Sequence, residues 1–145
     1  MKKINPCLWF DHQAEEAAKF YTSIFKNSKM GKVARYGSSG SEVSGQKEGT
    51  VMTAAFELEG LNIVGLNGGP IFKFSPAFSF FVSCESEQEI KQKWEKLSEG
   101  GKGRMGFDKY PWAEKYGWTA DRFGVDWQLI LSPRKEKNSP SIFIR

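Results

Sequence analysis

Hydrophobic and polar residues alternate near the start of the chain and then change to a helical spacing. Ile4–Phe10 alternates as a β-strand does, and this pattern stops at Asp11. Apolar positions then recur at spacings of three and four, which places one face of a helix at Ala14, Ala17, Ala18, Tyr21 and Phe25. The pattern predicts a strand, a tight turn and a helix that packs back onto the strand, with Asp11 as the N-cap.

The same unit returns in the second half of the chain. Phe78–Cys84 has the pattern of a strand, and Ser86 and Glu89 have the spacing of a helix capping box. One apolar helix face is then marked by Ile90, Trp94 and Leu97. The pair Gly100-Gly101 ends this second helix. The sequence therefore predicts a duplicated unit.

The other segments of each half predict strands and loops. In the first half we expect strands over residues 30–36, 50–58 and 61–67, a turn at 59–60 and a Gly/Ser-rich loop over 37–49. In the second half we expect a glycine-rich passage over 100–106, an aromatic loop with Phe107, Tyr110, Trp112 and Tyr116, and strands over 118–121 and 125–131. Prolines and charges predict a poorly ordered tail at the end of the chain.

These elements predict an α+β fold made of two βαβββ modules. The modules would cover about residues 1–74 and 75–132, with a tail over 133–145, and together they would form a single domain. One module alone leaves the sheet face opposite its helix uncovered. Two modules side by side would form a curved mixed sheet around a central cleft, where we expect the function to reside.

Composition narrows the class of protein. The chain has 145 residues with a formal net charge of +4, and its basic residues are spread out rather than gathered into a nucleic-acid surface. It has no apolar stretch long enough for a signal peptide or a membrane span, so we expect a cytoplasmic protein with no membrane partner. Its two cysteines, Cys7 and Cys84, lie in strand-like runs without metal or redox spacing, which predicts reduced thiols.

Strand parity selects the side chains that would line the cleft. These are Asn5, Cys7, Trp9, Asn62, Val64, Leu66, Ser79, Phe81, Ser83, Asp126 and Gln128. Trp118 joins this candidate site because it flanks an aromatic loop that would either fold over the cleft or bury a dimer interface. Aromatic walls with a few amides and hydroxyls suit a small, partly apolar ligand. The alternative, an ordinary core, stays open for the apolar members, whereas Asp126 and Gln128 favour the cleft because burying polar groups without partners is costly.

Three segments carry a resemblance to a known superfamily. They are LWFDHQAEEAAKFYTSIF at 8–25, LNGGPIFKF at 66–74 and WTADRFGVDWQ at 118–128. With the repeated order of elements, the chain resembles the vicinal oxygen chelate superfamily of glyoxalase I, extradiol dioxygenases and bleomycin-resistance proteins. Within it, the chain is most similar to the PhnB-like, or demethylubiquinone methyltransferase-like, family. The resemblance implies a homodimer.

The resemblance also implies where metal ligands would lie in metal-dependent relatives. Those positions fall near Asn5 or Cys7, Val64 or Gly65, Ala77 or Ser79, and at Gln128. None of these places offers the imidazole or carboxylate that such divalent metals need. The only histidine, His12, lies at the turn into the first helix. We therefore predict no metal and no cofactor.

Two functions compete on these residues. The first is a metal-independent protein that binds a small hydrophobic or aromatic molecule. The second is an enzyme of the same fold, such as a lyase, isomerase or dioxygenase, with a nonstandard site around Asp126, Gln128 and Asn5. The family label adds methyl transfer, although no glycine-rich turn opens a helix after the first strand. A nucleic-acid-binding protein is a third class, and the chain lacks the interleaved basic and exposed aromatic residues that it needs.

Overall fold

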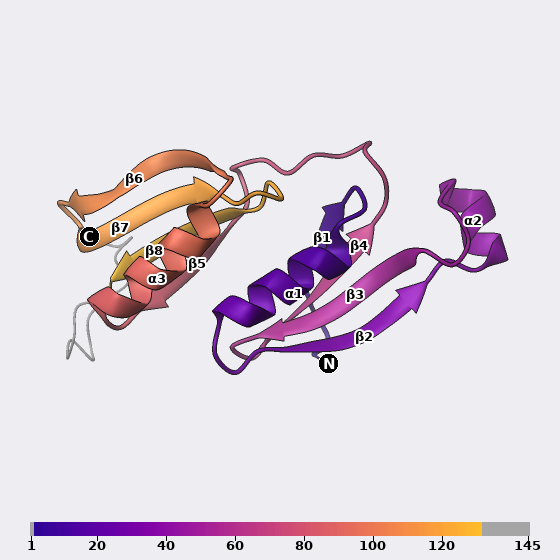
Figure 1. Ribbon diagram of the computed structural model, residues 1–145, viewed down its shortest axis with the longest axis horizontal. Coiled ribbons are helices and arrows are strands. Elements are labelled where there is room, and N and C mark those ends of the chain that lie inside the picture. The colour runs from indigo at the N-terminus through magenta and orange to yellow at the C-terminus, as the bar shows by residue number, and fades with distance from the viewer. Residues whose placement is uncertain (1, 132–145) are drawn as a thin grey trace. The chain divides into compact units, whose positions relative to one another are not determined.

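The computed structural model describes residues 2–131, which fall into two compact units divided between Lys73 and Phe74 (Figure 1). We call them the first and the second module. Each module contains a four-stranded mixed sheet with a helix packed on one face. The predicted α+β fold with two βαβββ modules is confirmed. The predicted tail over 133–145 lies outside the described residues.

The first module contains six elements in chain order: β1 (Cys7–Phe10), α1 (Ala14–Ile24), β2 (Lys29–Arg35), α2 (Ser38–Ser44), β3 (Val51–Leu58) and β4 (Leu61–Asn67). Its strands lie in the order β1-β4-β3-β2, with β1 parallel to β4 and the other pairs antiparallel. Glu59 and Gly60 have positive φ values of 48° and 90°, which form the predicted tight turn between β3 and β4.

Small residues allow α1 to lie close to its sheet. Ala14, Ala17 and Ala18 are fully buried, as is the larger Tyr21. A Cβ at Gly65 of β4 would lie 3.2 Å from the Ala14 Cβ, which is tighter than ordinary contact. The alanines on one face of α1 therefore determine how closely the helix approaches β4.

The start of α1 differs from the prediction. Asp11 is not the N-cap; Gln13 occupies that position and makes no side-chain cap hydrogen bond. Instead, the Ala14 backbone N–H donates to Oδ1 of Asn67, at 2.8 Å. The acceptor that a local cap would supply comes from the end of β4, a partner that no local pattern can indicate.

Two further predictions for the first module were wrong in part. The first strand begins at Cys7, so Ile4, which the pattern includes in the strand, precedes it and is 87% exposed. The Gly/Ser-rich segment contains the short helix α2, which lies beyond the ends of β2 and β3 (Figure 1). Gly45 ends this helix in the left-handed conformation, with φ of 78°, and its N–H donates to the Ser41 carbonyl. No residue of α2 is buried, so its local hydrogen bonds define it.

The second module contains five elements in chain order: β5 (Ser79–Cys84), α3 (Glu87–Ser98), β6 (Lys102–Tyr110), β7 (Ala113–Ala120) and β8 (Asp126–Leu131). Its strands lie in the order β5-β8-β7-β6, with β5 parallel to β8. The capping box of α3 is present: the Glu89 N–H donates to Ser86 Oγ at 3.1 Å, and Glu89 Oε1 accepts from the Glu85 N–H at 2.9 Å. Ile90 and Leu97 are fully buried on the predicted face.

The glycine-rich passage and the aromatic loop form a β-hairpin, so their prediction as irregular structure was wrong. Residues 102–110 form β6 and residues 113–120 form β7. The pairing shifts register at three places, so β6 carries bulges that break the alternation expected of a strand. Phe107, which the prediction placed in a loop, lies in β6 and stacks on Trp94 of α3 with ring centroids 5.4 Å apart.

Candidate functional site

Among residues 74–131, the sheet of the second module has one face against α3 and one face without a helix, which we call the helix-free face. Trp127 and Leu129 lie on the α3 side, with 1% and 0% of their surfaces exposed. Asp126 and Gln128, which alternate with them along β8, point the other way. Strand pairing then brings six predicted site residues to the helix-free face: Ser79, Phe81, Ser83, Trp118, Asp126 and Gln128.

Asp126 is the centre of one hydrogen-bond cluster on this face. Its side chain is fully buried and accepts two bonds from Arg104: Nε–H to Oδ2 at 2.9 Å and Nη2–H to Oδ1 at 3.1 Å. The Trp118 Nε1–H also donates to Oδ2, at 2.9 Å. The hydrogen bond to Asp126 raises the pKa of the Arg104 guanidinium above its ordinary value. The two bonds from Arg104 offset the cost of burying the charged carboxylate. Together with the bond from Trp118, they fix the orientations of the guanidinium and the indole.

Gln128 is the centre of a second cluster. The Tyr116 hydroxyl donates to Oε1 of Gln128, and Nε2 of Gln128 donates to Ser79 Oγ at 2.9 Å. Burial, followed by the charge of the neighbouring Tyr110, raises the pKa of the Tyr116 hydroxyl above its ordinary value. Tyr116 is therefore a protonated donor at neutral pH. The clusters place fixed polar atoms beside the Trp118 and Phe81 rings.

Sequence reasoning missed Arg104 and Tyr116. Tyr116 lies two residues before Trp118 in β7, so strand parity would have placed both on one face had this segment been predicted as a strand. Arg104 is the extra residue of a β-bulge, because Gly103 pairs with Thr119 and Met105 with Trp118. No periodic signal in the sequence indicates where such an extra residue will point.

The first module also has a helix-free face, opposite α1. Strand pairing places Cys7 beside Val64, and Trp9 beside Leu66, on this face. Asn62 lies on it as well, paired with Glu57. These side chains are half-buried or exposed. Asn5 is not part of this group, because it precedes β1 and its Nδ2 donates to the Lys2 carbonyl at 2.7 Å.

Trp9 is already in contact with the segment that follows β4. Its Nε1–H donates to the Gly69 carbonyl at 2.9 Å, and its ring meets Phe72 edge-on with centroids 4.9 Å apart. A Cβ at Gly68 would lie 2.2 Å from the indole, so only glycine allows the chain to pass this ring. The ring therefore supports the 68–72 segment. The second-module face offers the more complete set of polar and aromatic groups.

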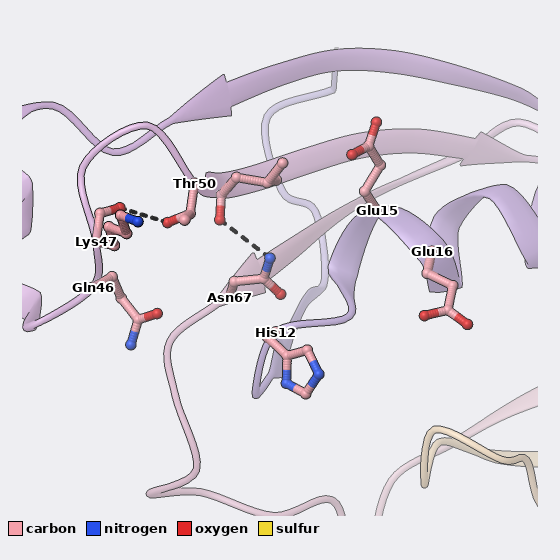
Figure 2. A pocket seen from close by; sticks show the side chains of 8 residues that line it. His12, Glu15, Glu16, Gln46, Lys47, Thr50 and Asn67 are labelled. Atoms are coloured by element: carbon pink, nitrogen blue, oxygen red, sulfur yellow. Dashed lines mark hydrogen bonds between the residues drawn. The ribbon is translucent and has the colours of Figure 1, made fainter.

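A pocket of about 480 Å³ lies elsewhere in the first module, at the N-terminal end of α1. Its lining is polar and of mixed charge: His12, Glu15, Glu16, Gln46, Lys47, Thr50, Val51 and Asn67. Figure 2 shows Asn67 between the loop that carries Gln46 and Lys47 and the turn that carries His12. Both polar atoms of the Asn67 side chain are occupied, since Nδ2 donates to the Val51 carbonyl at 3.1 Å and Oδ1 accepts from Ala14. None of the predicted site residues lines this pocket.

Residues 2–131 bring together no group of three or more histidine, cysteine, aspartate or glutamate side chains that could hold a metal ion. The binding cleft and the metal-independence inferred from the sequence stay predictions. Over the same residues, no helix combines the length and the apolar character needed to cross a bilayer.

Comparison with solved structures gives close and distant relatives of this chain. The PhnB protein from Bacillus cereus is 40% identical, with a TM-score of 0.82 over 90% of this chain and 100% of that chain. Protein PA1353 from Pseudomonas aeruginosa is 21% identical, with a TM-score of 0.73 over 91% of this chain and 98% of that chain. A glyoxylase/bleomycin resistance protein/dioxygenase domain from Frankia sp. EAN1pec is 17% identical, with a TM-score of 0.58 over 94% of this chain and 96% of that chain. The fold is thus that of the glyoxalase/bleomycin-resistance proteins.

Comparison with proteins of curated description gives no match. The sequence model of one family, described as 3-demethylubiquinone-9 3-methyltransferase, matches residues 2–130. This match spans both modules, and the Bacillus cereus PhnB protein agrees with it in sequence and in structure. The chain therefore belongs to the 3-demethylubiquinone-9 3-methyltransferase, or PhnB-like, family.

Proposed function

We propose that this protein binds a small, partly apolar organic molecule on the helix-free face of the second module, without a metal ion. The observation that carries the proposal is the pair of hydrogen-bond clusters around Asp126 and Gln128. Both lie beside aromatic rings on a sheet face that no helix covers. Few polar groups at fixed positions among apolar side chains are typical of small-molecule sites.

The polar groups of this face are held in place before any ligand arrives. Among the described residues, no buried side-chain nitrogen or oxygen lacks a hydrogen-bond partner. Trp118 and Gln128 each make a side-chain hydrogen bond within the clusters, so their side chains have little freedom left to lose. Phe81 is 38% exposed and offers an apolar surface to a ligand. Preorganisation of this kind lowers the entropy cost of binding.

The proposal includes the other properties inferred from the sequence. The protein would be a cytoplasmic homodimer without a cofactor, and neither nucleic acid nor a membrane would be its partner. In this role it would sequester or sense its ligand, and no bond would be made or broken.

The test is a binding experiment in the absence of metal. The protein is treated with a chelator, and its melting temperature is measured with 1,4-benzoquinones, naphthols and naphthoic acids. We expect at least one aromatic compound to raise the melting temperature, because a ligand that binds only the folded state stabilises it. Phe81→Ala should reduce this effect, whereas Phe72→Ala, at an exposed phenylalanine of the first module, should leave it unchanged. Stabilisation that requires added metal, or that Phe72→Ala alone abolishes, would refute the proposal.

The family description supports a second candidate, an enzyme that transfers a methyl group to a demethylubiquinone. Against it, residues 11–13 between β1 and α1 are Asp, His and Gln and form no glycine-rich cradle for a nucleotide-like methyl donor. Calorimetric titration with S-adenosylmethionine separates the two candidates. Binding of this donor, with methyl transfer to a demethylated quinol, would favour the enzyme. A lyase, isomerase or dioxygenase would instead show turnover of the compound that stabilises the protein.

A further inference from the structure

The guanidinium of Arg104 has more donors than its partner uses. An arginine has five N–H groups in a planar fork, and Asp126 accepts two of them, from Nε and Nη2. One N–H of Nη1 and the second N–H of Nη2 form the outer edge of the fork, and the other N–H of Nη1 points back toward Cδ. No described residue makes a hydrogen bond to them, and 24% of the arginine side chain is exposed.

The outer edge of Arg104 is held in a fixed orientation. The two bonds to Asp126 constrain the guanidinium plane, and the fully buried carboxylate is itself fixed by the Trp118 N–H. The bulge in β6 turns Arg104 toward these partners. A free edge on a fixed guanidinium matches the two oxygens of a carboxylate, and charge-assisted bonds of this kind are roughly twice as strong as neutral ones.

We infer that the outer edge of Arg104 receives the carboxylate of the bound molecule, so that the ligands of this protein are aromatic carboxylic acids. The inference rests on the proposed function, since it names the ligand class of the same face. The carboxylate lies on the arginine, and the aromatic body of the ligand lies along Trp118 and Phe81. Asp126 and Trp118 are positioning residues for the arginine, and Asp126 does not contact the ligand.

The test compares 1-naphthoate with 1-naphthamide, which has nearly the same shape and no charge. Each probe is titrated into the full-length protein, and the indole N–H signals are followed by ¹H–¹⁵N NMR. Trp118→Phe identifies the Trp118 signal among those of the five tryptophans. We expect both probes to shift this signal and 1-naphthoate to bind about tenfold more tightly, because two charge-assisted bonds replace neutral ones.

Arg104→Lys is the decisive variant, because lysine keeps the positive charge next to Asp126 and loses the outer edge. In this variant we expect 1-naphthoate to lose its advantage of about tenfold while the affinity for 1-naphthamide stays the same. The matched control is Arg122→Lys, the same change at an exposed arginine in the turn before β8. If Arg104→Lys does not fold, the double variant Arg104→Met with Asp126→Asn removes the ion pair as a unit, and the same loss of preference is expected.

The outcomes separate the inference from the proposed function. If neither probe shifts the Trp118 signal in the natural protein, both the proposed function and the inference fail. If both probes bind with equal affinity, or if the preference for 1-naphthoate survives Arg104→Lys, the inference fails and the proposed function stands. Loss of the preference in Arg122→Lys as well as in Arg104→Lys would indicate general electrostatics and would also overturn the inference.

Discussion

Asn67 connects three elements of the first module, and its removal is the sharpest test of how that module is held together. Its Oδ1 accepts from the Ala14 N–H at 2.8 Å, which supplies the missing cap of α1. Its Nδ2 donates to the Val51 carbonyl at the start of β3, at 3.1 Å. Its own carbonyl accepts from the Tyr36 hydroxyl at 2.6 Å, a bond that a side-chain substitution leaves in place.

Asn67→Ala removes both side-chain bonds at once. The asparagine is 6% exposed, so water cannot readily take over for its partners. A buried polar group left without a partner costs about 1–3 kcal/mol, and loss of a helix cap costs about 1 kcal/mol. Val51 is half-buried, so the cost of leaving its carbonyl without a partner lies at the low end of this range. We therefore expect the free energy of unfolding to fall by about 2–4 kcal/mol.

Urea denaturation followed by circular dichroism measures this change, and two variants make it specific. Asn62→Ala is the matched control, since it is the same substitution on the same strand at a half-buried position of the helix-free face, and it should change stability by less than about 0.5 kcal/mol. Asn67→Asp keeps the acceptor for Ala14 and loses the donor to Val51, so its stability should lie between the natural protein and Asn67→Ala. Equal stabilities of Asn67→Ala and Asn62→Ala would refute the role given to this side chain.

Two further predictions concern the second module and the cysteines. Gly101→Ala should lower the free energy of unfolding by about 3 kcal/mol, because a Cβ there would lie 2.0 Å from the Ala120 carbonyl oxygen. The control is Gly103→Ala, whose added Cβ would meet nothing within 4 Å. Equal urea midpoints for the two variants would contradict this prediction. Burial, which disfavours the thiolate, raises the pKa of Cys84 to about 12, so at pH 8 a thiol reagent should label only the exposed Cys7 and reach Cys84 only on unfolding. Two rapidly labelled thiols in the native protein would contradict this prediction.

Elements with local signals could be predicted from the sequence. The capping box at Ser86 and Glu89 predicts the start of α3, because all its hydrogen bonds join residues a few positions apart. The turn at Glu59 and Gly60 is also local, and β4 has the predicted bounds, 61–67. The pattern of a strand followed by an amphipathic helix recurs in both halves, and this repeat was enough to predict the two βαβββ modules.

Features that depend on distant partners could not be predicted. The cap of α1 comes from Asn67, which is 53 residues from Ala14 in the sequence. The pattern predicts a strand only over 118–121 of the β6–β7 hairpin, because glycines interrupt the alternation that identifies strands and β6 carries bulges. A side chain at the end of another strand decides the structure in the first case, and the pairing of β6 with β7 decides it in the second.

The same distinction changes the chemistry assigned to the candidate site. Strand parity predicts that Asp126 and Gln128 line the cleft, and in the structure both lie on the helix-free face of the second module. The enzyme hypothesis places its nonstandard site around Asp126. The structure shows that its side chain is fully buried and that two donors, Arg104 and Trp118, already occupy it. A general base must reach the proton that it removes, whereas a carboxylate enclosed by its own partners orients them. Asp126 is therefore a supporting residue of this face, and in our proposal Arg104, which it holds in place, is the group that contacts a ligand.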